Sequence, residues 1–212
     1  MAVYGRVNQP PFDESMPRAP VDPYGAAKAY CENMLEVFNE AYGIEYTIIR
    51  PHNCFGPLQN TADAFRNVLG IWMNRILRGK PPLIYGDGEQ ERAFSYIGDV
   101  TPPLAKAGFE KKANKQIINL GSPEVVTINK ACKLLLDVAG SDFEPVYMPA
   151  RPCEVKRAFC TTDKSEKILK YKFKTPLKKG LEKMWEWAKE KGPRTPTYKI
   201  PLEITTVSYT HL

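Results

Sequence analysis

The chain has 212 residues, of which 43% are hydrophobic and 25% are charged, and its net charge is +6. This composition predicts a packed globular protein and excludes an intrinsically disordered one. No stretch has the length and apolarity of a membrane span, and the amino terminus lacks the pattern of a signal peptide, so no membrane partner is expected.

Cysteine and histidine are too scattered to predict a metal centre. The five cysteines form no Cys-x-x-Cys pair, and the histidines are His52 and His211. A zinc site is therefore not expected, and reduced thiols in the cytoplasm are the simplest interpretation.

Much of the excess positive charge lies between Lys156 and Lys199, where lysines recur among Leu, Ile and Trp. Such a segment can bind nucleic acid, but it is more often the solvated face of amphipathic helices. We favour the second interpretation and expect no nucleic-acid partner. A positive field would also suit an anionic nucleotide substrate.

Predicted strands and helices alternate along the chain. The strands cover residues 1–5, 44–49, 83–85, 93–97, 116–120 and 144–148. The helices cover residues 23–42, 64–77, a segment opened by Asp99 as its cap, 127–139, 163–170 and 176–191. This alternation predicts an α/β fold with a parallel sheet, in which ligands bind where strands run into loops.

Tyr24 and Lys28 lie one turn apart at the start of the first long helix. Asp22 can cap this helix, and Pro23 stands where a missing N–H donor costs nothing. A lysine ammonium one turn away favours the phenolate form of a tyrosine, which can then exchange a proton with an alcohol or sugar hydroxyl. The spacing alone is common by chance, so the rest of the sequence has to support this interpretation.

Several short motifs follow this pair in a fixed order. With it and Val-Tyr-Gly at 3–5, they are Arg-Pro-His-Asn-Cys-Phe-Gly-Pro at 50–57, Ile-Tyr-Gly-Asp-Gly-Glu-Gln-Glu-Arg at 84–92, Phe-Ser-Tyr-Ile-Gly-Asp at 94–99, Ile-Asn-Leu-Gly at 118–121, Pro-Ala-Arg at 149–151 and Asp-Lys-Ser-Glu-Lys-Ile-Leu at 163–169. Together they resemble the extended short-chain dehydrogenase/reductase family of nucleotide-sugar enzymes. Within that family, the resemblance is greatest to UDP-glucose 4-epimerase and its relatives.

The resemblance implies a Rossmann-type parallel sheet, represented by its carboxy-terminal part, with a smaller α/β substrate-binding domain. Residues 1–53 and the returning segment 94–122 would belong to the NAD-binding domain. Residues 54–201 would mainly bind the nucleotide sugar. Residues 202–212 carry no helical period and are expected to be a non-native tail.

The resemblance also implies roles at the reacting centre. Tyr24 would be the acid/base, Lys28 would hold the nicotinamide ribose of NAD, and the backbone of Pro51 would lie near the nicotinamide. His52 either touches the substrate or packs the loop.

Substrate binding is likewise implied by the resemblance. Asn53 would bind the sugar nucleotide, Arg92 and Arg151 would clamp its diphosphate, and Glu154 would bind a ribose hydroxyl. For five further positions, contact with the nucleotide and packing in the core are equally good interpretations. These five are Asn67, Val68, Leu69, Leu83 and Tyr85.

The sequence departs from the family pattern at the cofactor site. It contains no Gly-x-x-Gly-x-x-Gly turn, which would hold the cofactor pyrophosphate, and the expected catalytic Ser or Thr would immediately precede Met1. We therefore expect the chain to be the carboxy-terminal part of a longer enzyme. In isolation it is expected to be poorly stable and to bind NAD weakly or not at all.

The predicted function is NAD-dependent epimerisation of a nucleotide sugar, of the UDP-hexose 4-epimerase type, by transient oxidation at C4. Related dehydratases and decarboxylases carry an acidic residue directly before Val3, where this chain has Ala2. Two alternatives stay open: another reductase or epimerase of the family, or a non-catalytic remnant that acts as a binding protein. The full-length enzyme is expected to be a homodimer, with Met34, Val37 and Phe38 fitting either the interface or the core.

Overall fold

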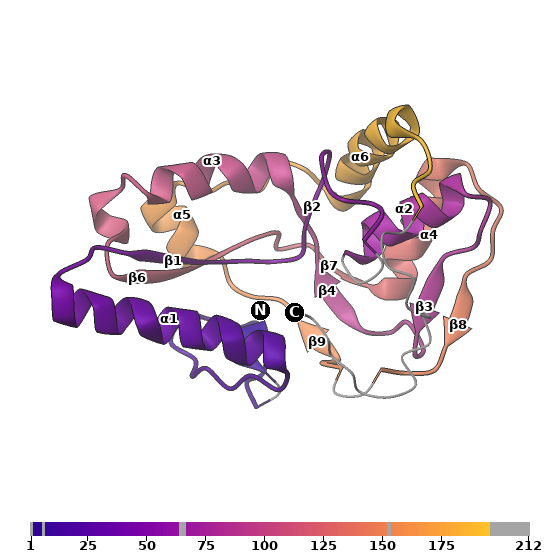
Figure 1. Cartoon of the computed structure of the whole chain (residues 1–212). Helices are drawn as coiled ribbons and strands as arrows, with labels where there is room; N and C mark the ends of the chain where they lie inside the picture. Colours follow the sequence, from indigo (N-terminus) through magenta and orange to yellow (C-terminus); the bar gives the residue numbers. More distant parts are fainter. Residues whose placement is uncertain (1, 6, 64–66, 152–153, 196–212) are drawn as a thin grey trace.

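The computed structural model describes residues 2–5, 7–63, 67–151 and 154–195 (Figure 1). The α-helices are α1 (Pro23–Tyr42), α2 (Val68–Leu77), α3 (Ile97–Ala107), α4 (Ile128–Ala139), α5 (Asp163–Leu169) and α6 (Leu177–Lys191), and the 3₁₀ helices are η1 (Ala2–Tyr4) and η2 (Lys111–Ala113). The strands are β1 (Thr47–Pro51), β2 (Cys54–Phe55), β3 (Leu83–Tyr85), β4 (Glu91–Ala93), β5 (Ser95–Tyr96), β6 (Gln116–Leu120), β7 (Val125–Thr127), β8 (Val146–Met148) and β9 (Arg157–Ala158).

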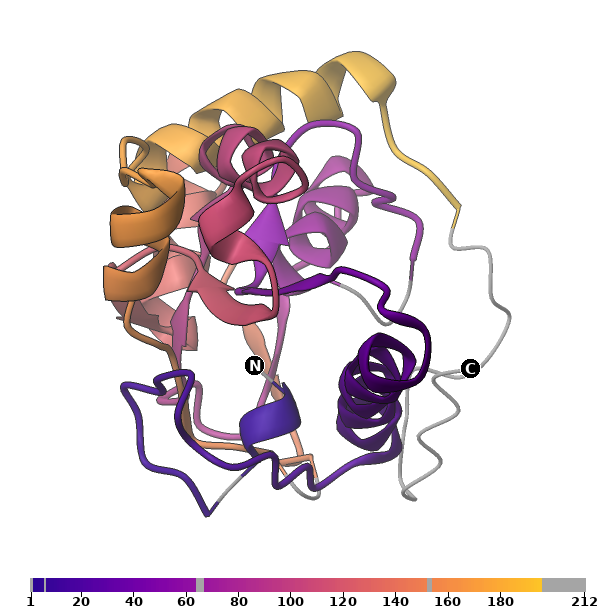
Figure 2. The ribbon, with the colours of Figure 1, turned by 90° about the vertical axis from the view of Figure 1, so that its left-hand side faces the viewer.

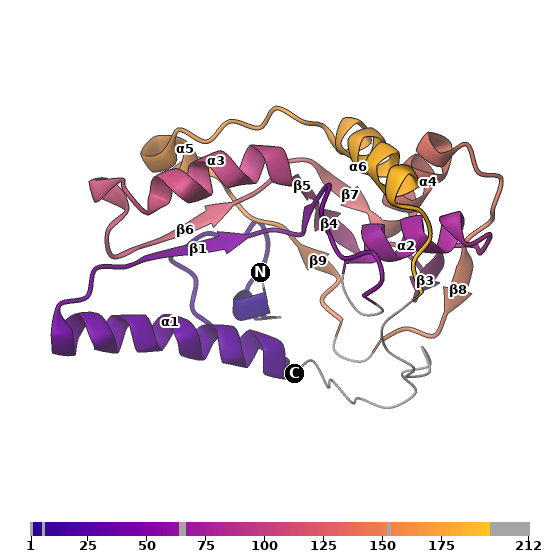
Figure 3. The same ribbon diagram turned by 45° about the horizontal axis from the view of Figure 1, so that its top comes forward.

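A parallel pair of strands, β1 and β6, forms the centre of the first lobe. Their register runs from Thr47 opposite Gln116 to Pro51 opposite Leu120. Helix α1 covers one face of the pair, and α3 and α5 cover the other (Figures 1 and 3). Ile118 is fully buried against the α3 and α5 side, as expected for strands covered on both faces.

The second lobe holds the largest apolar core. Helices α2, α4 and α6 pack on one another, and strands β3 and β8 pair in parallel beside them. Strand β4 lies between β7, which is antiparallel to it, and β9, which is parallel. Trp72 and Trp185 lie in this core, together with Leu135, Leu181 and Met184. The short parallel pair of β2 and β5 connects the two lobes.

Helix α1 has the predicted bounds and the predicted ends. The Asp22 carboxylate accepts a hydrogen bond from the backbone N–H of Gly25 at 2.6 Å. Gly43 ends the helix in the left-handed conformation, with φ of 70°. In α4, the Thr127 side chain caps the start by accepting a hydrogen bond from Lys130 N–H, and the left-handed Gly140 ends the helix.

The strand predicted at residues 1–5 is wrong, because Ala2–Tyr4 form a turn of 3₁₀ helix. A strand needs a neighbour for its backbone groups, and none of the described residues pairs with this segment as a strand. Instead, the Val3 carbonyl accepts a hydrogen bond from Ala19 N–H, and the Tyr4 ring stacks on Phe12.

Strand boundaries shift where pairing partners change. The strand predicted at 93–97 is split, because β4 pairs with β7 and β9 whereas β5 pairs with β2. The strand predicted at 44–49 is displaced to 47–51, where its partner β6 lies opposite. Strands β2, β7 and β9 are short and were not predicted.

The sequence predicted Asp99 as the cap of α3, and this prediction is wrong. The helix begins at Ile97, with Tyr96 as its N-cap, and Asp99 lies in its first turn. Its carboxylate accepts hydrogen bonds from the backbone N–H of Lys174 and Thr175, at 3.0 and 2.8 Å. It therefore attaches the segment before α6 to α3.

Some predictions lie outside the described residues: the start of the helix predicted at 64–77 and the tail at 202–212. The division into domains stays a prediction. Among the described helices, none combines the length and apolarity needed to cross a membrane.

Candidate functional site

Tyr24 and Lys28 meet on the first turns of α1. The Lys28 ammonium nitrogen lies 5.6 Å from the centre of the Tyr24 ring, and 38% of Tyr24 is exposed. Figures 1 and 3 show that α1 begins at the end of the lobe where β1 and β6 finish. The pair therefore lies at the carboxyl ends of parallel strands, where α/β proteins bind their ligands.

The start of α1 is fixed by close packing at Gly25. A Cβ atom at this position would lie 2.7 Å from the Ala2 carbonyl oxygen and 2.9 Å from Cβ of Pro20. Only glycine allows the helix backbone to approach η1 so closely. The position of the neighbouring Tyr24 follows from this contact.

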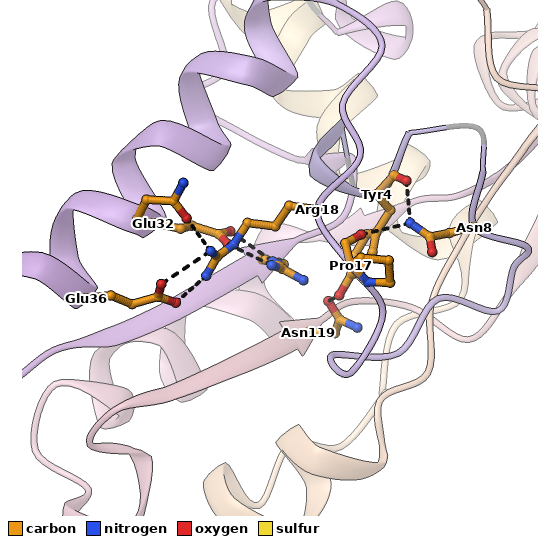
Figure 4. A network of polar contacts seen from close by, with 9 residues as sticks. Tyr4, Asn8, Pro17, Arg18, Glu32, Glu36 and Asn119 are labelled. Carbon is orange, nitrogen blue, oxygen red and sulfur yellow. Dashed lines mark hydrogen bonds and ion pairs between the residues drawn. The ribbon is translucent and has the colours of Figure 1, made fainter.

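A network of ion pairs fastens α1 to β1 (Figure 4). The buried Glu32 carboxylate accepts hydrogen bonds from Arg50 Nε and Nη2, at 2.9 and 2.7 Å, and from Arg18 Nε at 2.7 Å. Burial alone would raise the pKa of Glu32, but the two guanidinium groups outweigh it and hold the pKa below its ordinary value. The catalytic candidates on α1 are thereby tied to the strand that leads to Pro51.

Tyr4 fastens the amino-terminal loop to the same sheet. Its hydroxyl donates to Asn119 Oδ1 at 2.8 Å, and the Arg50 guanidinium lies 4.6 Å from the centre of its ring (Figure 4). Asn8 Nδ2 donates to the carbonyls of Tyr4 and Pro17, at 2.6 and 2.9 Å. The residues before α1 are thus held against β1 and β6.

The loop after β1 carries the next predicted residues. Pro51 is exposed at the strand end. His52 is fully buried and contacts the Cys160 thiol, and burial lowers its pKa to about 3. The structure thus favours the packing role for His52 over contact with the substrate. Asn53 has a positive φ of 31°, and its side-chain amide donates to the Ala93 carbonyl at 2.9 Å.

A second polar group lies on the other lobe, around Arg92. Arg92 Nη2 contacts a Glu154 carboxylate oxygen at 3.3 Å, and 16% of the arginine side chain is exposed. Gln90 Nε2 donates to the Tyr85 carbonyl at 2.6 Å and to Glu154 at 3.3 Å. Burial lowers the pKa of Arg92, and the nearby Glu154 carboxylate partly offsets that effect.

Arg151 and Tyr85 complete this group. The Arg151 guanidinium lies over the Tyr85 ring, 4.0 Å from its centre, although the arginine is exposed. Stacking on an aromatic ring holds the guanidinium plane in place and leaves its N–H donors available. The structure therefore gathers four predicted substrate residues in one place: Tyr85, Arg92, Arg151 and Glu154.

The remaining predicted positions serve packing or backbone contacts in the structure. Leu69 is 1% exposed within the main core, which favours its packing interpretation. Asn67 is the N-cap residue of α2 and donates from Nδ2 to the Cys54 carbonyl at 2.8 Å. Val68 packs against the same core, and the Leu83 carbonyl accepts from Trp72 Nε1 at 2.7 Å.

Three residues of the site were missed from the sequence: Glu32, Arg50 and Gln90. Arg50 and Gln90 both lie within motifs that carried the resemblance, and each adjoins or nearly adjoins a predicted site residue. For Arg50, the available signal was a charged residue at the end of a predicted strand. Its partner Glu32, 18 residues away on a helix, is identified only by the tertiary structure.

A model of one protein family matches the sequence of this chain. The model of the NAD dependent epimerase/dehydratase family matches residues 1–121, more than half of the chain. The chain belongs to this family. The predicted resemblance is thereby confirmed.

Individual family members agree with this assignment. A putative UDP-glucose 4-epimerase from Methanocaldococcus jannaschii is 34% identical over 189 residues, which are 89% of this chain and 60% of the relative. A UDP-glucuronate 4-epimerase from Thermodesulfobacterium geofontis is 28% identical, over 85% of this chain and 55% of the relative. The chain thus spans about 60% or less of the length of these relatives.

Solved structures of the family share the fold. The UDP-glucose 4-epimerase of Thermotoga maritima, crystallised with UDP-glucose, superposes with a TM-score of 0.82 at 34% identity, over 90% of this chain and 61% of its own. The UDP-glucuronic acid 4-epimerase of Bacillus cereus, in complex with UDP-glucuronic acid and NAD, gives 0.82 at 27% identity, over 89% and 59%. The predicted fold class, an α/β fold with Rossmann-type parallel strands, is confirmed.

Proposed function

We propose that this chain supplies the acid/base pair and the substrate-binding side of an NAD-dependent nucleotide-sugar 4-epimerase acting on a UDP-hexose. One observation carries the proposal. The Tyr24–Lys28 pair stands at the carboxyl ends of β1 and β6, and the group formed by Arg92, Arg151, Tyr85 and Glu154 lies on the other lobe. Similarity to nucleotide-sugar 4-epimerases over most of the chain supports it.

The residues present fit one end of the NAD cofactor. Lys28 can donate to ribose hydroxyls, and Pro51 is exposed at the end of β1, where the nicotinamide ring would lie. The cofactor, when bound, would accept and return the hydride at C4. The 212 residues contain no glycine-rich turn for its pyrophosphate, so that part of the cofactor would need residues beyond this sequence.

Tyr24 would move the proton in this reaction. Its phenolate oxygen would accept the proton of the sugar 4-hydroxyl as the substrate is oxidised and return it when the sugar is reduced on the other face. The Lys28 cation, 5.6 Å from the centre of the Tyr24 ring, would stabilise the negative charge on the Tyr24 oxygen. The Glu32–Arg50 pair would keep both groups aligned with the loop after β1.

The second polar group would bind the diphosphate. The guanidinium groups of Arg92 and Arg151 each offer several donors to phosphate oxygens. Glu154 now pairs with Arg92 at 3.3 Å, so a diphosphate would compete with a carboxylate for the same donors. Glu154 could then turn to a ribose hydroxyl.

A binding experiment tests this assignment in the chain itself. UDP is titrated calorimetrically into the protein and into two variants, Arg92→Gln and Arg157→Gln. Charged hydrogen bonds of this kind are worth about 1.5–3 kcal/mol, so Arg92→Gln should weaken binding at least tenfold. Arg157 is more exposed and pairs with Glu91, so its variant should bind UDP normally. Equal affinity for UDP in both variants would refute the diphosphate site.

Turnover is tested in a fusion that supplies the glycine-rich cofactor segment of a family relative. Conversion between UDP-glucose and UDP-galactose is measured, with the N-acetylated sugars as further substrates. Tyr24→Phe should lower turnover by about 10²–10⁴-fold without changing UDP affinity. Tyr30→Phe, on the same helix and 63% exposed, is the matched control. UDP binding without any turnover in the fusion would favour a non-catalytic binding protein.

The proposed enzyme would be a homodimer that pairs through α1. Val37 and Tyr42 are 52% and 74% exposed on this helix, and Phe38 is 38% exposed. An apolar helix face of this kind is typical of an interface between subunits. Sedimentation of the fusion protein, compared with a Val37→Glu/Phe38→Glu variant, would show whether a dimer forms through this face.

A further inference from the structure

A cavity of about 190 Å³ lies between α3 and α5, away from the candidate active site. Its walls come from α3, between Gly98 and Lys106, and from the end of α5 with the segment that follows it. Figures 1 and 2 show α3 and α5 side by side on the outer face of β1 and β6. The cavity is smaller than the roughly 300–1,000 Å³ of typical small-molecule pockets. It suits a small ligand.

The lining of this cavity is strongly basic. Four lysines contribute to it: Lys106, Lys170, Lys172 and Lys174. One carboxylate, that of Asp99, faces them, and it is already engaged by the backbone of Lys174 and Thr175 and by the Thr175 hydroxyl.

The basic side chains are presented by a segment with strict alternation. Residues 170–174 read Lys-Tyr-Lys-Phe-Lys, and the lysines are exposed while Tyr171 is 4% exposed in the core. Tyr171 packs with Val100 and Leu120, and Phe173 packs against the same cluster. The aromatic residues therefore anchor this segment in the core and leave its three lysines at the surface.

Most of this positive charge is uncompensated. Among the ion pairs of the described residues, none involves Lys170, Lys172 or Lys174, and Lys106 reaches Glu110 only at 3.8 Å. Burial raises the pKa of Tyr171, so its phenol stays neutral at physiological pH and adds no negative charge. Like charges in a row repel one another unless an anion lies between them.

We propose that this cavity binds a small polyphosphate anion. The lysines of residues 170–174 would contact the phosphate groups, and the hollow between α3 and α5 would hold these groups close to Lys106. Lysine is a point donor without the flat fork of arginine, so it suits phosphate groups of varied orientation. The polyphosphate could be inorganic or the phosphate chain of a nucleotide.

Calorimetric titration with inorganic triphosphate at low salt tests the proposal on the chain. The variant Lys172→Gln/Lys174→Gln should bind about twofold to 25-fold more weakly, since exposed charge pairs contribute a factor of about 1.4–5 each. It leaves untouched the left-handed cap at Lys170 and the ion pair of Lys106. Lys172 and Lys174 are exposed, as are Lys178 and Lys179, which are exchanged in the control variant, so folding should be unaffected in both.

The matched control is Lys178→Gln/Lys179→Gln, which removes the same charge from α6 just outside the cavity and should change the affinity less than twofold. Comparison with ATP distinguishes a nucleotide from an inorganic source. The proposal is overturned by absence of triphosphate binding or by equal losses in the two lysine variants.

Discussion

Arg50 and Glu32 form a bidentate ion pair that joins strand β1 to helix α1, with N–O distances of 2.9 and 2.7 Å. The side chains are 4% and 8% exposed, so both charges are removed from water. Removing one partner of such a pair leaves the other buried and uncompensated, which costs about 3–5 kcal/mol. The pair therefore stabilises the fold and also fixes α1, which carries the candidate acid/base Tyr24, against β1.

Glu32→Gln should lower the free energy of unfolding by about 3 kcal/mol, measured by denaturant unfolding. Glu36 provides the control, because it also pairs with Arg18 but its side chain is 41% exposed. Glu36→Gln should cost less than about 1 kcal/mol. Similar losses in the two variants would contradict the role of burial at Glu32.

The buried His52 should make the stability of the chain depend on pH. Its pKa is about 3 in the folded protein against an ordinary 6.5, so between these values the unfolded chain binds one more proton than the folded one. Stability conferred by the neutral imidazole is present above pH 6.5 and is lost as the pH falls towards 3. The slope from this group is at most about 1.4 kcal/mol per pH unit.

His52→Gln should remove this contribution. Free energies of unfolding measured between pH 7 and 4 should fall less steeply in the variant than in the original chain, whatever its stability at neutral pH. Acidic groups such as Glu32 titrate in both proteins and cancel in the comparison. Parallel pH profiles would show that His52 is not buried as a neutral group.

Gly25→Ala should destabilise the chain although alanine is the better helix former by about 1 kcal/mol. The added methyl would lie 2.7 Å from the Ala2 carbonyl oxygen, so either η1 or the start of α1 must move. Gly108 gives the contrast, because a Cβ there would meet only the Ala105 carbonyl, at 3.6 Å. A lower melting temperature for Gly25→Ala alone is the expected result.

Gln90→Leu should disturb the group of residues around Arg92, which is proposed to bind the diphosphate, without removing a charge. Gln90 holds Glu154 at 3.3 Å and the Tyr85 carbonyl at 2.6 Å, so its loss frees the carboxylate that pairs with Arg92. UDP affinity should fall about threefold to tenfold, measured by titration. Gln116→Leu, on β6, is the control for loss of a partly buried amide, and it should leave UDP affinity unchanged.

Local sequence determined the elements whose ends have their own chemistry. Asp22, Pro23 and Gly43 set the bounds of α1, and Thr127 and Gly140 set those of α4, because caps and left-handed glycines act within a few residues. The motif order likewise predicted the family and the residues that gather around Arg92.

Tertiary structure decided whatever depends on a distant partner. Residues 2–5 form no strand because no described strand pairs with them, and the run at 93–97 divides because its halves pair with different neighbours. Three further features also depend on distant partners: the Glu32–Arg50 pair, the burial of His52 and the lysine-lined cavity between α3 and α5. Each depends on groups that are far apart in the chain, and such contacts form only when the whole chain packs.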